Sequence, residues 1–306
     1  SVAGAPAFAD TAYVAVTAIV QHPALDACRD GVKDELKAEG FEDGKNLKFV
    51  YESAQGNPAT AAQIAQKFVG ENPTVIVPIS TPSAQAVLSA TSDIPVVFTA
   101  VTDPLGAKLV SNLEKPGGNV TGMSDLSPIG KHLELIHQIV PSAKKIGVPY
   151  NPGEANSVTL LNLLKEKAGP MGMEIVEAPA PKSSDVQAAA QSLVGKADVI
   201  YVPTDNTIVS ALEAVIGVGI DNKLPVFAGD TDSVKRGAIA AVGFDYYDVG
   251  RQTGKIVARI LKGEKPGDIA VQGVEITQLF VNPGAAQKMG VAIPEALISS
   301  AKEVVK

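Results

Sequence analysis

The chain has 306 residues, of which 45% are hydrophobic and 19% are charged, and its formal net charge is −7. This length is too great for one ordinary core and suits two domains of about 120–150 residues each. The acidic balance, with no basic cluster larger than the pair Lys144 and Lys145, argues against nucleic acid as a partner. The single cysteine, Cys28, excludes an internal disulfide and any cysteine-based zinc site.

The first ten residues are rich in Ala, Gly and Pro and look unlike the rest of the chain. Within them, Ala7-Phe8-Ala9 has the small-x-small pattern that precedes a signal-peptidase cut. We therefore expect residues 1–10 to be a signal-peptide remnant or a disordered tail, and the protein to be exported to the periplasm. The sequence holds no run of ~20 apolar residues, so it predicts no membrane-spanning helix.

Strand and helix patterns alternate along the chain in two series. The first series has predicted strands at 13–20, 47–51, 74–79 and 95–99, with helices at 24–39, 59–69 and 84–90. The second has strands at 145–148, 174–177, 199–202 and 225–228, with helices at 156–168, 186–194 and 208–220. A strand at 119–123 lies between the series, and a helix at 249–261 and a strand near 273–280 follow them. Such alternation predicts parallel sheets with right-handed crossovers, covered on both faces.

The two series match each other in three places and in the same order. The strand ending at Ile79 leads into Ser80-Thr81-Pro82, and the strand ending at Val202 leads into Pro203-Thr204-Asp205. The strands that follow each begin at a proline, and the first strand of each series also ends in a similar polar turn. We therefore predict two similar Rossmann-like lobes: lobe one from residues 11–121 with 248–275, and lobe two from 122–247 with 276–306.

Ligands of open parallel sheets bind beyond the carboxyl ends of the strands, so two facing lobes would share one cleft. The strand ends of lobe one carry mainly hydroxyl groups beside helix N-termini, which favour an anion such as a carboxylate. Those of lobe two carry carboxylates and amides, which suit an ammonium group. This contrast predicts a zwitterionic ligand, an α-amino acid. The candidate ligand-binding residues are Gln21, His22, Ser80, Thr81, Thr99, Thr102, Tyr150, Glu154, Asn156, Asp205, Asn206, Asp230 and Asp245.

These residues have different expected roles. Asp205 would hold the amine, and His22 and Tyr150 would form walls around the side chain of the ligand. Asp245 would cap the next helix, orient Tyr246 or touch the amine. Since Ser, Thr, Asp and Asn are also the preferred N-caps of helices, each of them alone fits a capping role equally well.

Enzyme motifs are missing from the sequence. No G-x-G-x-x-G follows the first predicted strand, and neither a phosphate-binding P-loop nor a G-x-S-x-G nucleophile elbow occurs. The three histidines form no metal-binding pattern, because His132 and His137 share one predicted helix away from His22. We therefore predict a protein that is not an enzyme and that uses neither a cofactor nor a metal.

Several stretches resemble the substrate-binding components of ABC importers, in particular proteins that bind tryptophan or phenylalanine. They include Gln21-His22-Pro23-Ala24-Leu25-Asp26, Ala54-Gln55-Gly56-Asn57, Val97 to Pro104, Asn119-Val120-Thr121-Gly122, Tyr150 to Asn156, Thr204-Asp205-Asn206-Thr207 and Gly243-Phe244-Asp245-Tyr246-Tyr247. The resemblance implies a type I periplasmic-binding fold with three crossovers between lobes, hinge closure on the ligand, and delivery to an ABC permease.

The resemblance also implies roles for individual residues. The turns at Ser80–Thr81 and Thr99–Thr102 resemble carboxylate holders, and Asp205, followed by Asp230, resembles an amine partner. We expect a monomer that carries a large apolar or aromatic amino acid. A ligand sensor of the same fold, and a carrier of a purine, a sugar or a short peptide, are the alternatives.

Overall fold

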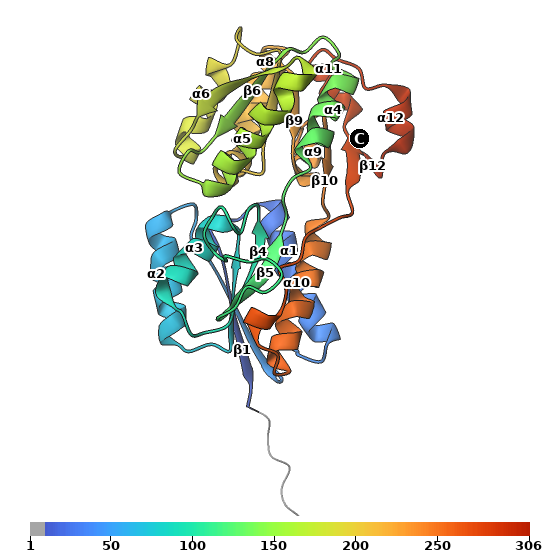
Figure 1. The fold of residues 1–306 in the computed structure, drawn as a ribbon. Coiled ribbons are helices and arrows are strands. Elements are labelled where there is room, and N and C mark those ends of the chain that lie inside the picture. The colour runs from blue at the N-terminus through green and yellow to red at the C-terminus, as the bar shows by residue number, and fades with distance from the viewer. Residues whose placement is uncertain (1–9) are drawn as a thin grey trace, which may run out of the picture.

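The computed structural model describes residues 10–306 and consists of two α/β lobes joined by three chain crossovers (Figure 1). Each lobe has its own hydrophobic core, and the two cores share no residue. The predicted fold class, two Rossmann-like lobes with parallel sheets, is confirmed. The expectation for the N-terminal tail falls almost entirely on residues 1–9, which lie outside the described residues.

Lobe one is built on a five-stranded parallel sheet in the order β2-β1-β3-β4-β5. Strands β3 and β4 are buried along their whole length, as expected where helices cover both faces of a sheet. Helices α1 and α10 lie on one side of this sheet and α2 and α3 on the other (Figure 1). The elements are β1 (Ala12–Ala18), α1 (Pro23–Ala38), β2 (Leu47–Ser53), α2 (Pro58–Gly70), β3 (Val75–Ile79), α3 (Thr81–Ala90), β4 (Val96–Val101), β5 (Val120–Ser124) and α10 (Tyr246–Leu261).

Lobe two repeats this plan. Its parallel sheet has the order β7-β6-β8-β9, which corresponds strand for strand to β2-β1-β3-β4, and a smaller sheet β10-β11-β12 completes the lobe. The elements are α4 (Ile129–Ile139), β6 (Lys145–Tyr150), α5 (Ala155–Ala168), β7 (Glu174–Pro179), α6 (Val186–Ser192), β8 (Val199–Val202), α7 (Asn206–Ser210), α8 (Leu212–Asp221), β9 (Val226–Ala228), α9 (Asp232–Lys235), β10 (Ala240–Gly243), β11 (Gln278–Val281), α11 (Pro283–Lys288), α12 (Glu295–Ser300) and β12 (Glu303–Val304).

The three crossovers run from β5 to α4, from β10 to α10, and from the end of lobe one to β11 (Figure 1). The first and third are hydrogen-bonded to each other, since the Ser124 N–H donates to the Gln272 carbonyl at 2.7 Å. Met123, Phe244 and Tyr246 pack into the core of lobe one, a few residues outside the limits expected for that lobe. The crossovers are thus bonded to each other and packed on the core of lobe one.

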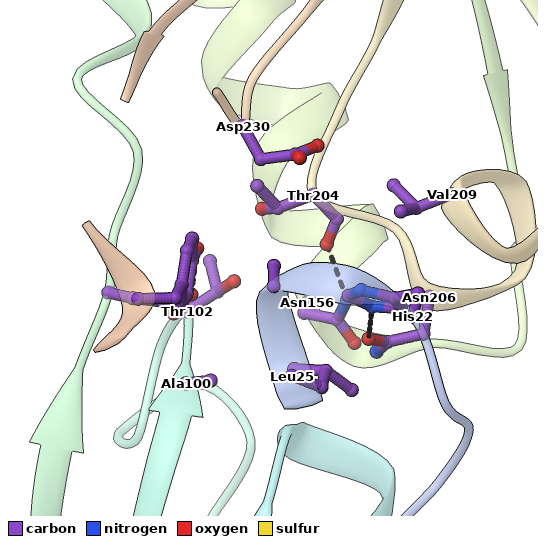
Figure 2. Close-up of a pocket in the computed structure, with 12 residues that line it drawn as sticks. His22, Leu25, Ala100, Thr102, Asn156, Thr204, Asn206, Val209 and Asp230 are labelled. Carbon is purple, nitrogen blue, oxygen red and sulfur yellow. Dashed lines mark hydrogen bonds between the residues drawn. The ribbon is translucent and has the colours of Figure 1, made fainter. Parts of the chain in front are cut away.

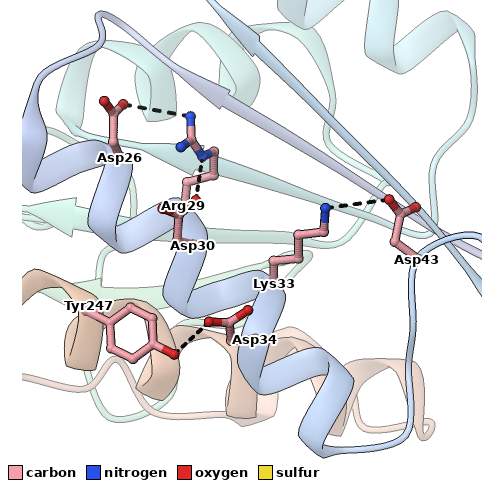
Figure 3. A network of polar contacts seen from close by, with 7 residues as sticks. All are labelled: Asp26, Arg29, Asp30, Lys33, Asp34, Asp43 and Tyr247. Carbon is pink, nitrogen blue, oxygen red and sulfur yellow. Dashed lines mark hydrogen bonds and ion pairs between the residues drawn. The ribbon is translucent and has the colours of Figure 1, made fainter.

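Helices α1 and α10 are in backbone contact because glycines face the contact. A Cβ atom on Gly250 would lie 2.0 Å from the Cys28 carbonyl oxygen, and one on Gly31 would lie 2.1 Å from the Tyr247 carbonyl oxygen. On the surface, the Tyr247 hydroxyl donates to Asp34 at 2.7 Å within a row of polar contacts along α1 (Figure 3). This contact fixes the start of α10 relative to α1.

Two predicted elements differ from the structure. The helix expected at 208–220 is divided into α7 and α8 at Ala211, whose φ of −117° and ψ of 27° leave the helical region. The strand expected near 273–280 begins only at Gln278, because the residues before it form the third crossover and have no neighbouring strand in a sheet.

Candidate functional site

A narrow cavity lies between the two lobes, close to the carboxyl ends of their parallel strands (Figure 2). Its volume is about 20 Å³, enough for about one water molecule. A ligand larger than water therefore needs the lining to move apart. The lining residues are His22, Ala24, Leu25, Ala100 and Thr102 from lobe one, Asn156, Thr204, Asn206, Val209 and Asp230 from lobe two, and Asp125 and Tyr246 from two crossovers.

Two carboxyl groups face this cavity, and no lysine or arginine is among its lining residues. Asp125 is 4% exposed, and its Oδ2 accepts a hydrogen bond from the Tyr246 hydroxyl at 2.6 Å. Asp230 is 2% exposed and accepts hydrogen bonds from the Ser233 N–H and hydroxyl at 2.9 and 2.7 Å. Burial raises the pKa of Asp125 to about 6. At neutral pH the cavity is therefore negative.

Four polar atoms of the lining are buried and have no hydrogen-bond partner among residues 10–306. They are His22 Nδ1, Asp125 Oδ1, Asn156 Oδ1 and Thr204 Oγ1. Leaving a buried polar atom unpaired costs about 1–3 kcal/mol, so such atoms rarely gather at one place without a reason. Their common position around one cavity indicates that a polar ligand supplies the missing partners.

One hydrogen bond at the cavity joins the two lobes. His22, at the N-cap of α1, lies with its Nε2 3.2 Å from Asn206 Oδ1 at the start of α7 (Figure 2). Burial lowers the pKa of His22, although the nearby charge of Asp230 opposes this effect. The imidazole is therefore neutral when it makes this contact.

A second group of unpaired hydroxyls lies at the N-terminus of α3. Ser80, Thr81 and Ser83 are each at most 2% exposed, and none of their side-chain oxygens has a hydrogen-bond partner in the part of the chain that the structure describes. Ser80 is the N-cap, but its side chain caps nothing and its φ is +83°, which is unusual for a residue other than glycine. These hydroxyls lie outside the cavity lining as it stands.

Asp205, the residue expected to hold the amine, is not among the residues that line the cavity. It is fully buried, and its carboxylate accepts hydrogen bonds from the Asn151 N–H at 2.6 Å, the Ser157 hydroxyl at 2.5 Å and the Ile208 N–H at 2.9 Å. These contacts make Asp205 the N-cap of α7 and tie it to β6 and α5. The preference of aspartate for N-caps thus decides its place.

Glu154 lies beside Asp205, and its hydrogen bonds are also to residues of lobe two. Its Oε2 accepts the Asn206 N–H at 3.0 Å, and the Ser157 hydroxyl lies 3.2 Å away. Burial, and then the charge of Asp205, raise the pKa of Glu154 well above its usual value. Glu154 lines a wider groove outside the cavity, which it shares with Asn206 and with residues of α2 and α3.

The other predicted residues are divided between cavity and scaffold. His22, Thr102, Asn156, Asn206 and Asp230 line the cavity. Four others do not: Gln21 is exposed, Thr99 bonds to Thr253 within lobe one at 2.7 Å, Tyr150 packs against the core of lobe two, and Asp245 caps α10 by accepting from the N–H groups of Tyr247 and Asp248.

Asp125 was not among the predicted residues, although it lines the cavity. It comes directly after β5, where the chain leaves lobe one, and its backbone N–H still bonds to the Val101 carbonyl at 3.1 Å. The sequence feature that could have predicted Asp125 is its position, as an acidic residue just after a predicted crossover strand. The hydrogen bond between Asp125 and Tyr246 could not be predicted from the sequence, because the two residues are far apart in it.

Neither a metal site nor a membrane span emerges from residues 10–306. Within that range no three His, Cys, Asp or Glu side chains gather closely enough to hold a metal ion. No helix of the described chain combines the length and apolar character needed to cross a bilayer.

Comparison with known proteins gives one consistent result. Residues 13–305 match the family described as ABC transporter substrate binding protein. A tyrosine-binding protein of Clostridioides difficile (strain R20291) is 45% identical over 269 residues, which cover 88% of this chain and 78% of the relative.

Two solved structures extend the comparison. An ABC domain from Streptococcus pneumonia in complex with L-Trp has a TM-score of 0.93 at 35% identity, covering 97% of this chain and all of the other. The ligand-free, open structure of a substrate binding protein with adhesive properties from Clostridium difficile has a TM-score of 0.72 at 41% identity, covering 96% and 99%.

Proposed function

Because the chain belongs to the ABC transporter substrate-binding protein family, we propose that it binds an aromatic α-amino acid between its lobes and delivers it to an ABC permease. The main support is the pair of buried carboxyl groups, Asp125 and Asp230, at a cavity whose lining includes no lysine or arginine. Buried carboxylates need a cationic partner, and the ammonium group of an amino acid supplies one with three N–H donors. Substrate-binding proteins of this family capture and release their ligand without chemical change, so the chain is not an enzyme.

The carboxylate of the ligand would bind at the N-terminus of α3. The unpaired hydroxyls of Ser80, Thr81 and Ser83 lie there beside free helical N–H groups, and the helix dipole favours an anion. A ligand that widens the cavity toward α3 would reach these donors. Ser80 and Thr81 thus keep the role expected from the sequence, while Asp230 and Asp125 take the role expected of Asp205.

The aromatic side chain would rest on the apolar part of the lining, which Leu25 and Val209 provide from opposite lobes (Figure 2). Small residues, Ala24 and Ala100, leave room beside them. Related proteins bind tyrosine and L-Trp, which supports an aromatic ligand over a sugar or a nucleoside.

We further propose that the lobes close on the ligand. Two contacts between lobes support this: His22 with Asn206, and the Thr159 hydroxyl with Asp103 Oδ2 at 3.3 Å. The chain also superposes much better on the L-Trp complex than on the ligand-free, open structure, although the latter has the more similar sequence. A ligand that touches both half-sites stabilises the closed form through these differential contacts.

Isothermal titration calorimetry on protein stripped of ligand by unfolding and refolding tests this proposal. We expect saturable binding of one aromatic amino acid per chain and no binding of aliphatic amino acids, hexoses or nucleosides. Binding of a hexose or a nucleoside without any aromatic amino acid would overturn the proposal. Uptake of the labelled amino acid by cells, lost when this gene is deleted, tests the import role and the extracytoplasmic location.

A further inference from the structure

The two carboxyl oxygens of Asp125 are in different situations. Oδ2 accepts a hydrogen bond from the Tyr246 hydroxyl at 2.6 Å, whereas Oδ1 is buried and has no hydrogen-bond partner among the described residues. The phenol keeps its proton, because burial and the charge of Asp125 raise the pKa of Tyr246 well above its usual value. The Tyr246 hydroxyl is therefore the donor of this bond whenever Asp125 is charged.

Both partners of this bond are anchored in lobe one. The Asp125 N–H donates to the Val101 carbonyl, at the end of β4, at 3.1 Å. Tyr246 is the first residue of α10, is 4% exposed and packs into the core of lobe one. The close backbone contact at Gly31 and Gly250 fixes α10 against α1, since neither glycine has room for a Cβ atom. The pair can thus form without any contact from lobe two.

Little besides Tyr246 favours the charged form of Asp125. Burial raises the pKa of Asp125 to about 6, and only the Tyr246 hydroxyl and the backbone N–H of Asp125 oppose this effect. The other titratable groups that face the pair are Cys28 of α1 and Asp230 of lobe two. The thiol is neutral, because burial raises the pKa of Cys28 to about 12, and Asp230 is itself an acid. Among residues 10–306, Tyr246 is therefore the one side-chain donor to the Asp125 carboxylate.

We infer that Tyr246 is the positioning residue of the ammonium site: its hydroxyl holds the Asp125 carboxylate in its charged form and leaves Oδ1 free for the ligand. The inference rests on the proposed function, in which Asp125 and Asp230 bind the ammonium group. A hydrogen bond to a carboxylate favours the charged form, so without this bond Asp125 would take up its proton at a higher pH. A protonated Asp125 does not attract an ammonium group, and affinity would be lost at that higher pH.

Two neighbouring tyrosines offer a matched pair of variants. Tyr246→Phe removes the hydroxyl that donates to Asp125 and keeps the ring that packs into lobe one. Tyr247→Phe removes a hydroxyl that also donates to an aspartate, Asp34 at 2.7 Å, on the surface of α1 (Figure 3). Neither Tyr247 nor Asp34 lines the cavity. Both changes are also made together with Asp125→Asn, which removes the titrating carboxyl group.

Isothermal titration calorimetry of the full, ligand-stripped chain at pH 6, 7 and 8 provides the measurement, with L-tyrosine, L-tryptophan and L-phenylalanine as probes. For each probe that binds, Tyr246→Phe should weaken binding about fivefold at pH 6, about twofold at pH 7 and less than about 1.5-fold at pH 8, which corresponds to an upward shift of about one pH unit. Tyr247→Phe should match the unmodified protein throughout. Combined with Asp125→Asn, Tyr246→Phe should change affinity by the same factor at pH 6 and pH 8.

The outcomes separate this inference from the function on which it rests. If none of the three probes binds the unmodified protein at any of these pH values, the proposed function fails. If a probe binds and Tyr246→Phe weakens it equally at pH 6 and pH 8, the hydroxyl contacts the ligand or supports the fold, and the inference is overturned while the function stands. An unchanged affinity of Tyr246→Phe at pH 6 would also overturn the inference.

A second measurement tests the same bond without removing it. Biosynthetic replacement of tyrosine by 3-fluorotyrosine makes the Tyr246 phenol more acidic and a stronger donor, so Asp125 should ionise at a lower pH. We expect the affinity of the labelled protein to be lost at a lower pH than that of the unlabelled protein, and the labelled Asp125→Asn variant to show no such shift. A midpoint that stays in place or moves to higher pH would contradict the role of Tyr246.

Discussion

The turns after β3 and β8 occupy the same place in the two lobes, yet they use their polar groups in opposite ways. After β8, the carboxylate of Asp205 accepts three hydrogen bonds from its own lobe and is fully buried. After β3, the side chains of Ser80 and Thr81 are equally buried, but their hydroxyls have no hydrogen-bond partner among the described residues. The turn after β8 therefore stabilises its own lobe, whereas the turn after β3 has hydroxyl groups that can still bond to a ligand.

This difference between the two turns shows how two lobes of the same topology can contribute different chemical groups to one binding site. Both lobes bring polar turns to the cleft, because the carboxyl ends of their parallel strands face each other. What separates scaffold from ligand contact is whether the protein already satisfies each polar atom. By that criterion Asp205 belongs to the scaffold, whereas Asp125 and the hydroxyls at α3 are available to a ligand. Asp230 is hydrogen-bonded to Ser233, and it is the position of this carboxylate in the cavity lining that offers its charge to a ligand.

The largest expected effect is on the stability of lobe two. Replacing Asp205 by alanine removes the acceptor of the Asn151 and Ile208 N–H groups and leaves the Ser157 hydroxyl with Glu154 alone, so we expect the free energy of unfolding to fall by about 3 kcal/mol. Asp205→Asn, which keeps an oxygen for the Ile208 N–H, should cost less. Urea unfolding followed by circular dichroism measures both variants. Unchanged stability together with lost ligand binding would show that Asp205 contacts the ligand, and would contradict the difference drawn between the turns after β3 and β8.

A smaller effect, on binding alone, is expected at Asp230. Asp230→Asn keeps an acceptor for Ser233 but removes the charge, so affinity for the amino acid should fall by about 2–3 kcal/mol, or roughly 30- to 150-fold. The stability of the ligand-free protein should change little. Calorimetry that finds the same affinity in the variant would remove Asp230 from the ammonium site.

Asp125 should give a pH dependence of opposite sign for stability and for binding. Its pKa of about 6 lies above the ordinary 3.8, so its contribution to stability is present at low pH and is lost as the pH rises through 6. Binding of an ammonium needs the charged form. Affinity should therefore fall below pH 6, by at most about tenfold per pH unit.

The control for this pH dependence is Asp125→Asn, which cannot titrate. We expect its affinity to be weaker than that of the unmodified protein at pH 7 and to change much less between pH 7 and 5. Titrations at several pH values provide the measurement. An affinity of the unmodified protein that rises on acidification would show that Asp125 does not contact a cation.

The smallest effect is expected at Ser80. Since the Ser80 hydroxyl has no hydrogen-bond partner within residues 10–306, Ser80→Ala should change the free energy of unfolding by less than about 0.5 kcal/mol and weaken ligand binding about 5- to 10-fold. Ser192→Ala, where a hydroxyl bonds to the Ala189 carbonyl far from the cleft, serves as the control for affinity. A Ser80 variant that loses stability but not affinity would place this hydroxyl in the scaffold, as Asp205 is.

Most of the fold was predictable because its signals are local. Buried parallel strands read as continuous apolar runs, and the runs that form β3 and β8 stand out for this reason. The matching turns after them predicted the repeat, which the two strand orders confirm. The break between α7 and α8 was missed, since Ala211 favours helix and neither glycine nor proline marks the position.

The site was less predictable for a physical reason. Helix caps and ligand contacts use the same residue types at the same strand ends, so the sequence alone does not separate Asp205 from Asp230. Asp125 and Tyr246 meet only because two crossovers run side by side between the lobes. His22 was expected as a wall of the cleft, but its unpaired acceptor depends on Asn206, which approaches from the other lobe.

The central claim is that the two lobes enclose an aromatic amino acid, and one competition measurement tests it most directly. Ligand-stripped protein is incubated with an equimolar mixture of the twenty amino acids, common hexoses and nucleosides, separated from free solutes by gel filtration and denatured. Mass spectrometry then identifies what is released. We predict tyrosine or another aromatic amino acid at about one molecule per chain. Release of a hexose, a nucleoside or an aliphatic amino acid in its place, or of no solute at all, would contradict the claim.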